Sequence, residues 1–216
     1  MPVVGLMNHA QINDVTFSRK VCTTSIENGW RESHRREQII SMAYDARALA
    51  NLLLDWAEDL RFPLTHMALH KILFYANGWF LAEHNMPLVK QPFEAWEHGP
   101  VLRSLYKAFK GAGKNPVADR ASYFNPITNE TSVLTADITP ADSAFLCNIL
   151  RAYGHVDALE LSHMTHRKGS PWDQIWNSTT GRVSLGMTIS DDLIRQDFLN
   201  QRSPLLSDIA ISTSRA

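Results

Sequence analysis

The sequence predicts a mainly α-helical protein with a minor β component: a compact helical domain around a buried central helix, with a small β-hairpin or short strands. Three observations lead to this prediction. Most of the chain after residue 45 places apolar residues at helical spacing. Proline, glycine and capping residues stand where these segments begin and end. One segment, residues 64–84, is apolar on nearly every side, as a helix at the centre of a bundle should be.

The first predicted helix begins after Asp45, its N-cap, and keeps an apolar face as far as Leu60. Pro63 separates it from the next segment. Thr65 caps the second helix, which runs to about His84. Because this second helix is the most apolar in the chain, we expect it to form the buried centre of the domain.

The middle of the chain is less regular. Residues 85–98 contain two prolines and two short extended runs, which predict a small hairpin or β-like connection. Pro100 is predicted at the first position of a new helix, where its missing N–H does no harm, and Gly111 and Gly113 end that helix. Residues 112–138 follow as a loop with at most two short strands.

The last part of the chain predicts four short helices. Thr139 caps the first, Asp157 the second and Ser170 the third, which has Pro171 at its first position. Residues 190–199 form the fourth.

Composition divides the 216 residues into three parts. Residues 1–41 are mostly polar and lack sustained periodicity, which predicts a flexible extension. Residues 42–200 form one helical domain, and residues 201–216 form a C-terminal tail. The net charge of −1 gives no overall field that would attract nucleic acid, so a nucleic-acid partner is not expected.

The sequence also lacks a predicted membrane span. Its best candidate, residues 67–82, is interrupted by polar positions and falls short of the ~20 apolar residues that a span requires. The two cysteines, Cys22 and Cys147, lie far apart and form no CxxC pair, and no secretory signal stands at the start. We therefore expect a cytoplasmic protein without a membrane partner, with Cys147 in the core.

Histidines raise the question of a metal site. His66 and His70 have the i, i+4 spacing that can hold a metal ion, but the glutamate of an HExxH motif is absent. His163 and His166, with Glu160 one turn earlier, form a second set without a visible further ligand. We interpret both sets as structural and predict no metal and no cofactor.

Lys71 lies on an apolar face of the central helix. A lysine there must reach solvent, pair with a carboxylate or donate to backbone carbonyls, and Asp55, Glu94 and Glu97 are candidate partners. A structural ion pair is the favoured interpretation. The alternative is a small polar pocket formed by Lys71, Glu97 and His166.

Three motifs follow one another in the chain: LTHMALHKILFYANGWFLA, FEAWEHGPVLRSLYKAFK and YGHVDALELSHMTHRKGSPW. In this order they resemble the signatures of the Panacea domain, the SocA-like antitoxin family, over roughly residues 43–177. We take from these segments a set of candidate binding or structural residues and no catalytic residue. The candidates are Lys71, Tyr75, Trp79, Glu94, Trp96, Glu97, Gly99, Pro100, His166, Ser170, Pro171 and Trp172.

Two parts of these motifs predict a local structure. Trp96, Gly99 and Pro100 are expected to make a rigid corner between an extended segment and a helix, with a toxin-contacting ridge as the alternative. His166 is expected to hydrogen-bond to the turn at Ser170, with Trp172 packed beneath it. We interpret this second feature as a clasp that locks the fold.

The resemblance implies an antitoxin, often encoded beside a toxin gene on bacterial chromosomes or prophages, that neutralises a cognate toxin protein by direct binding. Some relatives are linked to delivery of the bound toxin to a protease, and no enzymatic activity is implied. Two alternatives stay open. One is an enzyme that uses Lys71, Glu97 and His166, with or without a metal. The other is a phage or mobile-element adaptor that presents a partner to host machinery through residues 1–41.

Overall fold

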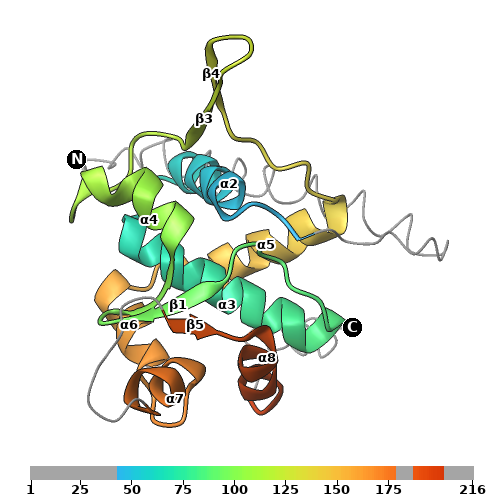
Figure 1. Cartoon of the computed structure of the whole chain (residues 1–216), viewed down its shortest axis with the longest axis vertical. Helices are drawn as coiled ribbons and strands as arrows, with labels where there is room; N and C mark the ends of the chain where they lie inside the picture. The colour runs from blue at the N-terminus through green and yellow to red at the C-terminus, as the bar shows by residue number, and fades with distance from the viewer. Residues whose placement is uncertain (1–42, 179–186, 202–216) are drawn as a thin grey trace, which may run out of the picture.

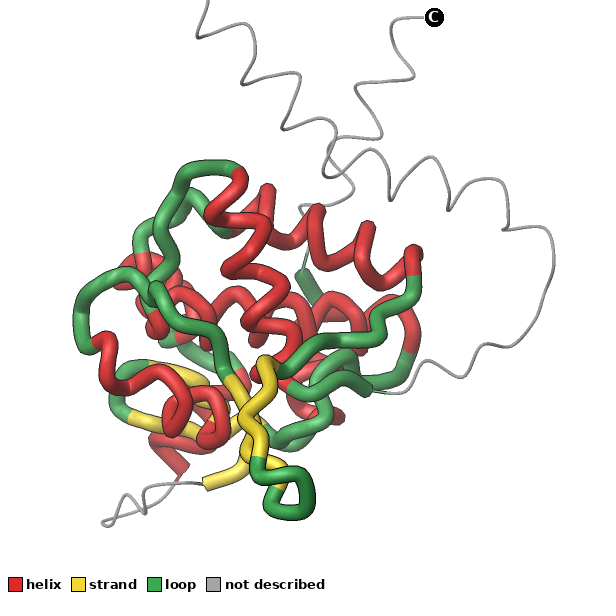
Figure 2. The backbone as a smooth tube through the Cα atoms, turned by 90° about the horizontal axis from the view of Figure 1, so that it is seen from above, coloured by secondary structure: helices red, strands yellow, loops and turns green. Residues whose placement is uncertain are grey.

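The computed structural model describes residues 43–178 and 187–201 of the chain. The predicted extension over residues 1–41 lies outside the described residues, and so does the predicted tail except for Gln201. Within the described segments the protein is mainly helical with short antiparallel strands, as predicted (Figure 2).

The first two described helices begin at the predicted caps. Helix α2 spans Ala46–Asp59, and the Asp45 side chain accepts a hydrogen bond from the Arg47 amide. Helix α3 spans His66–His84, and the Thr65 hydroxyl accepts one from the Ala68 amide. These side chains satisfy backbone donors that the first turn of a helix leaves without partners, which is why the sequence signals identified both starts.

Helix α3 lies at the centre of the molecule, as its apolar pattern predicted (Figure 1). Every residue from 68 to 81 is buried, and α3 contacts elements on all its sides: α2, α4, α5, α6, α8 and β2. Gly78 permits the close approach of α8. A Cβ at this position would lie 2.4 Å from the ring of Phe198 in α8.

A three-stranded antiparallel sheet packs beside α3, in the order β2-β1-β5. Its strands are β1 (Phe93–Trp96), β2 (Gly99–Leu102) and β5 (Met187–Ile189). The predicted hairpin is therefore present. Pro100, however, lies in β2 opposite Ala95, and the helix predicted to start there, α4 (Arg103–Phe109), begins three residues later. Proline is tolerated here because β2 is an edge strand of the sheet.

The segment predicted as a loop contains the two short strands that the sequence allowed, β3 (Ser122–Asn125) and β4 (Glu130–Val133). They pair with each other alone and project from the body of the molecule (Figure 1). Between α4 and this hairpin lies one turn of 3₁₀ helix, η1 (Lys110–Ala112).

The remaining helices begin where the sequence predicted them. They are α5 (Pro140–Tyr153), α6 (Ala158–Thr165), α7 (Pro171–Ser178) and α8 (Asp191–Leu199). Thr139, Asp157 and Ser170 each accept a hydrogen bond from a first-turn amide of the helix that follows. Cys147 is buried in α5, in the core as expected. Within residues 43–178 and 187–201, no helix has the length and apolarity needed to cross a membrane.

Candidate functional site

Side chains from three helices hold the turn between β1 and β2. Glu97 and His98 form its tip, between the last strand pair, Trp96 and Gly99. Four backbone carbonyls in and beside this turn each contact a side chain that comes from α3, from α6 or its C-cap, or from α7. The contacts are Trp172 Nε1 to the Trp96 carbonyl (2.7 Å), His166 Nε2 to that of Glu97 (3.2 Å), Ser162 Oγ to that of His98 (2.8 Å) and Lys71 Nζ to that of Pro100 (3.0 Å).

We call these four side chains and the backbone of residues 96–100 the hairpin clasp. The Lys71 contact with the Pro100 carbonyl is buried, and a buried carbonyl without a partner costs about 1–3 kcal/mol, so Lys71 stabilises the turn chiefly by preventing that loss. The contacts with the Trp96 and His98 carbonyls are partly buried and the one with Glu97 is exposed, so each of these contributes less. Lys71 lies far in the sequence from Ser162, His166 and Trp172, and the four side chains meet at this turn. The clasp therefore fixes the sheet against α3, α6 and α7.

Lys71 is the deepest member of the hairpin clasp, with 1% of its surface exposed. Of the three possibilities that the sequence left open, Lys71 adopts the third, because its Nζ donates to a backbone carbonyl. Among the described residues Lys71 forms no ion pair within 4 Å, so the favoured carboxylate pairing was wrong. Of the three candidates, Asp55 pairs with Arg120, Glu94 pairs with Arg103, and Glu97 is exposed. Burial lowers the pKa of Lys71 to about 7.

Gly99 is required by the hairpin clasp for two separate reasons. Its φ of 97° lies in a region that residues with a Cβ rarely adopt. A Cβ would also lie 2.5 Å from Thr165 Oγ1 and 2.7 Å from Lys71 Nζ. The rigid corner predicted at this position does exist, but it joins two strands rather than a strand and a helix.

His166 contacts two backbone carbonyls rather than the Ser170 turn that the sequence suggested. Its Nδ1 lies 2.6 Å from the Ser162 carbonyl and its Nε2 3.2 Å from that of Glu97. A neutral imidazole donates from one nitrogen only, so the tautomer decides which of the two carbonyls receives the hydrogen bond. Ser170 Oγ instead donates to the Thr165 carbonyl (2.8 Å).

Trp172 packs against His166 as expected, with ring centroids 3.9 Å apart in an edge-on arrangement. It stands one residue after Pro171, the buried first residue of α7. Because proline at this position presets the helical backbone angle, the start of α7 is fixed and the indole N–H is aimed at the Trp96 carbonyl. Ser170, Pro171 and Trp172 thus act together to build one side of the hairpin clasp.

The Glu94 carboxylate lies beside the hairpin clasp and forms its own network. It accepts two hydrogen bonds from Arg103 (2.8 and 2.9 Å) and one from Trp96 Nε1 (2.9 Å). Burial opposes ionisation of Glu94, but these hydrogen bonds outweigh it and lower the pKa of the carboxyl group. Arg103 escaped the sequence analysis because its pairing with Glu94 depends on the strand register.

The proposed trio of Lys71, Glu97 and His166 does converge, but through the backbone. Lys71 and His166 both approach the β1–β2 turn, where Glu97 offers its carbonyl oxygen while its carboxylate side chain is exposed. The arrangement thus lacks a carboxylate beside the lysine and the imidazole. It holds a turn in place and does not resemble an acid–base set.

Tyr75 and Trp79 lie in the aromatic core on the other side of α3. Trp79 Nε1 donates to the Tyr153 hydroxyl (2.9 Å), and Tyr75 stacks on the Tyr153 ring with centroids 4.5 Å apart. Phe198 of α8 packs edge-on against both. Burial raises the pKa of Tyr75, as expected for a phenol enclosed by rings. Both candidates therefore contribute to packing.

The i, i+4 histidines are built into the core. His70 is buried, and its Nδ1 accepts a hydrogen bond from the Leu102 amide (3.1 Å), which ties α3 to β2. Burial lowers the pKa of His70 well below its ordinary value, which favours the neutral ring. His66 packs edge-on against His70. His163 and Glu160 face each other 3.9 Å apart on the exposed side of α6.

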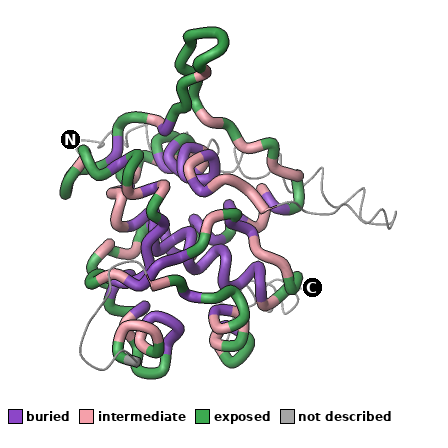
Figure 3. Tube along the Cα trace, viewed as in Figure 1, coloured by how far each residue is buried: buried purple, intermediate pink, exposed green. Residues whose placement is uncertain are grey.

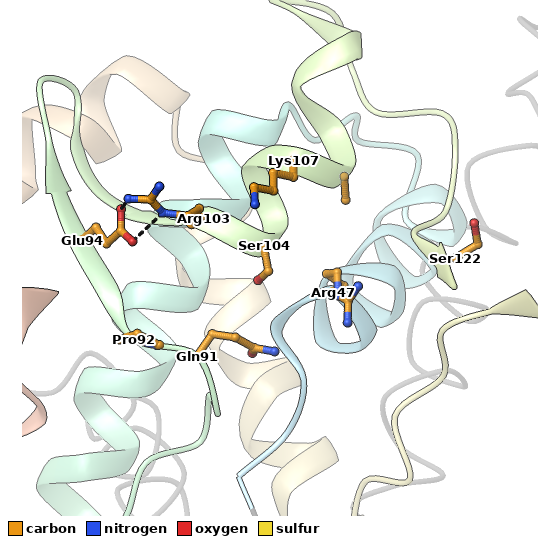
Figure 4. A pocket seen from close by; sticks show the side chains of 9 residues that line it. Arg47, Gln91, Pro92, Glu94, Arg103, Ser104, Lys107 and Ser122 are labelled. Atoms are coloured by element: carbon orange, nitrogen blue, oxygen red, sulfur yellow. Dashed lines mark hydrogen bonds and ion pairs between the residues drawn. The ribbon is translucent and has the colours of Figure 1, made fainter. Parts of the chain in front are cut away.

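Within the described residues, no three His, Cys, Asp or Glu side chains come together in a group that could hold a metal ion. What the structure adds instead is a cleft of about 540 Å³ that the sequence did not indicate (Figure 4). Arg47 of α2, Arg103 and Lys107 of α4, Glu94 of β1 and Ser122 of β3 contribute to its walls. These residues come from four elements, so no local pattern could have grouped them.

The side chains of the hairpin clasp lie in a region that matches a known family. The family model for the antitoxin SocA-like Panacea domain matches residues 69–173, a range that includes all four of these side chains. Antitoxin SocA of Caulobacter vibrioides (strain NA1000 / CB15N) is 34% identical over 158 residues, which cover 73% of this chain and 84% of the relative. No solved structure matches the chain significantly. On this sequence evidence, the chain belongs to the SocA-like antitoxin family and carries the Panacea domain.

Proposed function

We propose that the protein is the antitoxin of a toxin–antitoxin pair and that it neutralises a cognate toxin protein by binding it directly. Family membership supports an antitoxin role. The single observation that carries the binding mechanism is the use of the motif side chains. Lys71, Ser162, His166 and Trp172 direct their polar atoms at backbone carbonyls of the hairpin clasp.

Because the motif side chains are engaged inside the protein, toxin binding falls to other parts of its surface. Side chains that serve as catalysts must present a reactive atom to a substrate, whereas those of the hairpin clasp are engaged with the protein's own backbone. The motifs therefore maintain a rigid scaffold, and recognition is left to the outer surface. Such a division lets related scaffolds bind different toxins through different surfaces.

Co-expression with the product of the adjacent gene tests the proposal. The toxin alone should stop growth, and growth should recover when this chain is expressed with it. Affinity purification of one partner should recover the other in a fixed ratio. If the chain neither rescues growth from any neighbouring gene product nor binds one, the proposal is wrong.

A protease is a second partner that the family resemblance suggests. Delivery to a protease and direct inhibition differ in a measurable way. Direct inhibition works with purified toxin and antitoxin alone, whereas delivery shortens the half-life of the toxin in cells. We expect inhibition in the purified system, with any change in toxin half-life as an additional effect.

An enzyme is the second candidate function, and one observation favours it: burial lowers the pKa of Lys71 to about 7, and perturbed groups often mark reactive sites. Lys71→Met and His166→Gln separate the two ideas. Variants that stay folded and still neutralise the toxin support binding. If both variants lose neutralisation but still form the complex with the toxin, an enzymatic function is supported.

Deletion of residues 1–41 tests the adaptor alternative. If residues 43–201 hold the toxin-binding surface, the shortened chain should rescue growth as the full chain does. An adaptor that recognises its partner through the extension would lose activity. We place the activity in the cytoplasm, where a newly made toxin would be met.

A further inference from the structure

The β3–β4 hairpin exposes an unusual number of apolar side chains. Of the seven large hydrophobic residues that are exposed in the described segments, four lie between Tyr123 and Val133. Phe124 is 58% exposed, Val133 54% and Ile127, at the tip, 92%. Figure 3 shows the hairpin as a projection that is exposed over most of its length. Clustered exposed apolar side chains of this kind mark surfaces that bind other proteins.

The strand register places the most apolar side chains on one face. Ser122 pairs with Val133, and Phe124 pairs with Thr131, so these four side chains point to the same side. Tyr123 lies on the opposite side. The face with Phe124 and Val133 is continuous with the cleft described above, because Ser122 of this face also lines that cleft.

The cleft carries a surplus of positive charge. Arg103 is neutralised by Glu94, and Arg47 by Asp45 (2.9 Å). Lys107, which also lines the cleft, forms no ion pair within 4 Å among the described residues. Figure 4 shows Lys107 and Arg103 on α4, with Arg47 on α2 across the cleft. An anionic group would therefore complement this part of the surface.

The hairpin is anchored at its base, although seven of its eight strand residues are exposed. Asn51 of α2 is buried. Its amide nitrogen donates to the carbonyl of Ala121, just before β3, and to that of Leu134, just after β4 (2.8 Å each). Its amide oxygen accepts from the Ala121 N–H (2.8 Å). Arg120 adds ion pairs to Asp55 and Glu58. An isolated hairpin is only marginally stable, so this anchor holds an apolar face ready for a partner.

We propose that the Phe124–Val133 face of the β3–β4 hairpin, together with the cleft at Lys107, is the surface that docks the toxin. The complementary toxin surface is an apolar patch bordered by a carboxylate, which enters the cleft. This inference rests on the proposed function and specifies the contact surface. The remaining exposed apolar residues, Leu159, Met164 and Leu199, lie on α6 and α8 rather than in the cluster on the hairpin.

Binding of the purified toxin by paired variants tests the apolar part. Phe124→Ala should weaken the Kd by ~30-fold or more, as expected for a central aromatic contact. Tyr123→Ala removes a similar ring, 47% exposed, from the opposite face of the same hairpin and should change the Kd less than ~3-fold. Leu159→Ala on α6 is a second control and should have no effect. Equal losses for Phe124→Ala and Tyr123→Ala, or no loss for either, overturn the proposal.

Charge reversal tests the cleft. Lys107→Glu should weaken the Kd by ~10-fold at low salt, and this loss should shrink as salt is raised because the interaction is electrostatic. Lys168→Glu makes the same change at an exposed lysine between α6 and α7 and should leave the Kd unchanged. If both reversals act alike, the effect is one of net charge and the cleft is not the site.

The outcomes separate this inference from the proposed function. If the wild-type chain binds and neutralises the toxin while the Phe124 and Lys107 variants do so equally well, the function holds and the docking surface lies elsewhere. If the wild-type chain binds no neighbouring gene product, both proposals fail. Circular dichroism and thermal unfolding of each variant confirm that a loss of binding is not a loss of fold.

Discussion

The two β-hairpins of this protein have strands of the same length but opposite surroundings. In β1–β2 seven of the eight strand residues are buried, whereas in β3–β4 seven of the eight are exposed. Side chains from α3, α6 and α7 reach the β1–β2 turn. The β3–β4 hairpin is held only near its base, by Asn51 and Arg120.

This contrast shows how the fold separates stability from recognition. Changes in β1–β2 should act on folding, because most of its strand residues are buried and several of its carbonyls contact side chains of the core helices. Changes on the exposed strands of β3–β4 should act on binding and leave the free energy of unfolding nearly unchanged.

Gly99→Ala should have the largest effect. The new Cβ would combine an unfavourable φ with contacts of 2.5 and 2.7 Å inside the hairpin clasp, for a loss of about 3–5 kcal/mol in the free energy of unfolding. Gly113→Ala is the matched control, since its φ is 59° but nothing lies within 4 Å of the added carbon. It should cost only about 1 kcal/mol. Urea unfolding measures both, and equal losses would mean that the hairpin clasp is loosely packed.

Local signals predicted much of this fold. Helices α2 and α3 begin at Asp45 and Thr65 because a capping side chain acts within three residues of itself. The burial of α3 followed from its lack of a polar face. Pro100 was misassigned because proline suits both the first turn of a helix and an edge strand, and only the pairing with Ala95 decides between them. Strand β5 was missed because its three residues pair with β1 almost a hundred positions earlier.

The candidate site was predicted less completely, for the same physical reason. The sequence required Lys71 to find a partner but could not choose among three carboxylates and a backbone carbonyl. That choice depends on the β1–β2 register, which places the Pro100 carbonyl 3.0 Å from Nζ. Ser162 stood in a recognised motif, yet its contact with His98 crosses 64 positions. The cleft at Lys107 joins separate elements and left no sequence signal.

Asn51→Leu tests the base of the β3–β4 hairpin. Leucine has a similar volume but cannot bond to Ala121 and Leu134, so buried backbone groups would lose partners at a cost of about 2–3 kcal/mol. Hydrogen exchange should accelerate at the amides of residues 121–134 and much less in α3. Exchange that accelerates equally in both places would show that the hairpin base is not an independent anchor.

Lys71→Met should change how stability depends on pH. Burial lowers the pKa of Lys71 from 10.5 to about 7, so between these pH values the unfolded chain binds more protons than the folded one. The contribution of Lys71 to the free energy of unfolding therefore rises with pH from 7 towards 10.5, by up to about 1.4 kcal/mol per pH unit. Below pH 7 the penalty for burying the charge is fully present.

The variant should lack this rise, although it also leaves the Pro100 carbonyl without its donor and so loses about 1 kcal/mol at every pH. Urea unfolding at pH 7, 8 and 9 measures the difference in slope between the two proteins. Parallel pH profiles would mean that Lys71 keeps its proton in the folded state and that water reaches the hairpin clasp.

Phe124→Ala should have the smallest effect on stability, because the ring is 58% exposed and its strand pairs only with β4 among the described residues. We expect a change below about 0.5 kcal/mol in the free energy of unfolding. Phe93→Ala makes the same substitution in β1, where the ring is 1% exposed and packs on Phe74 with centroids 5.3 Å apart. It should cost about 3–5 kcal/mol.

A large loss for Phe124→Ala would show that the ring supports the fold, and its role in docking would then need a variant that keeps the hairpin intact. A small loss, combined with weakened toxin binding, would establish that one hairpin serves the fold and the other serves recognition.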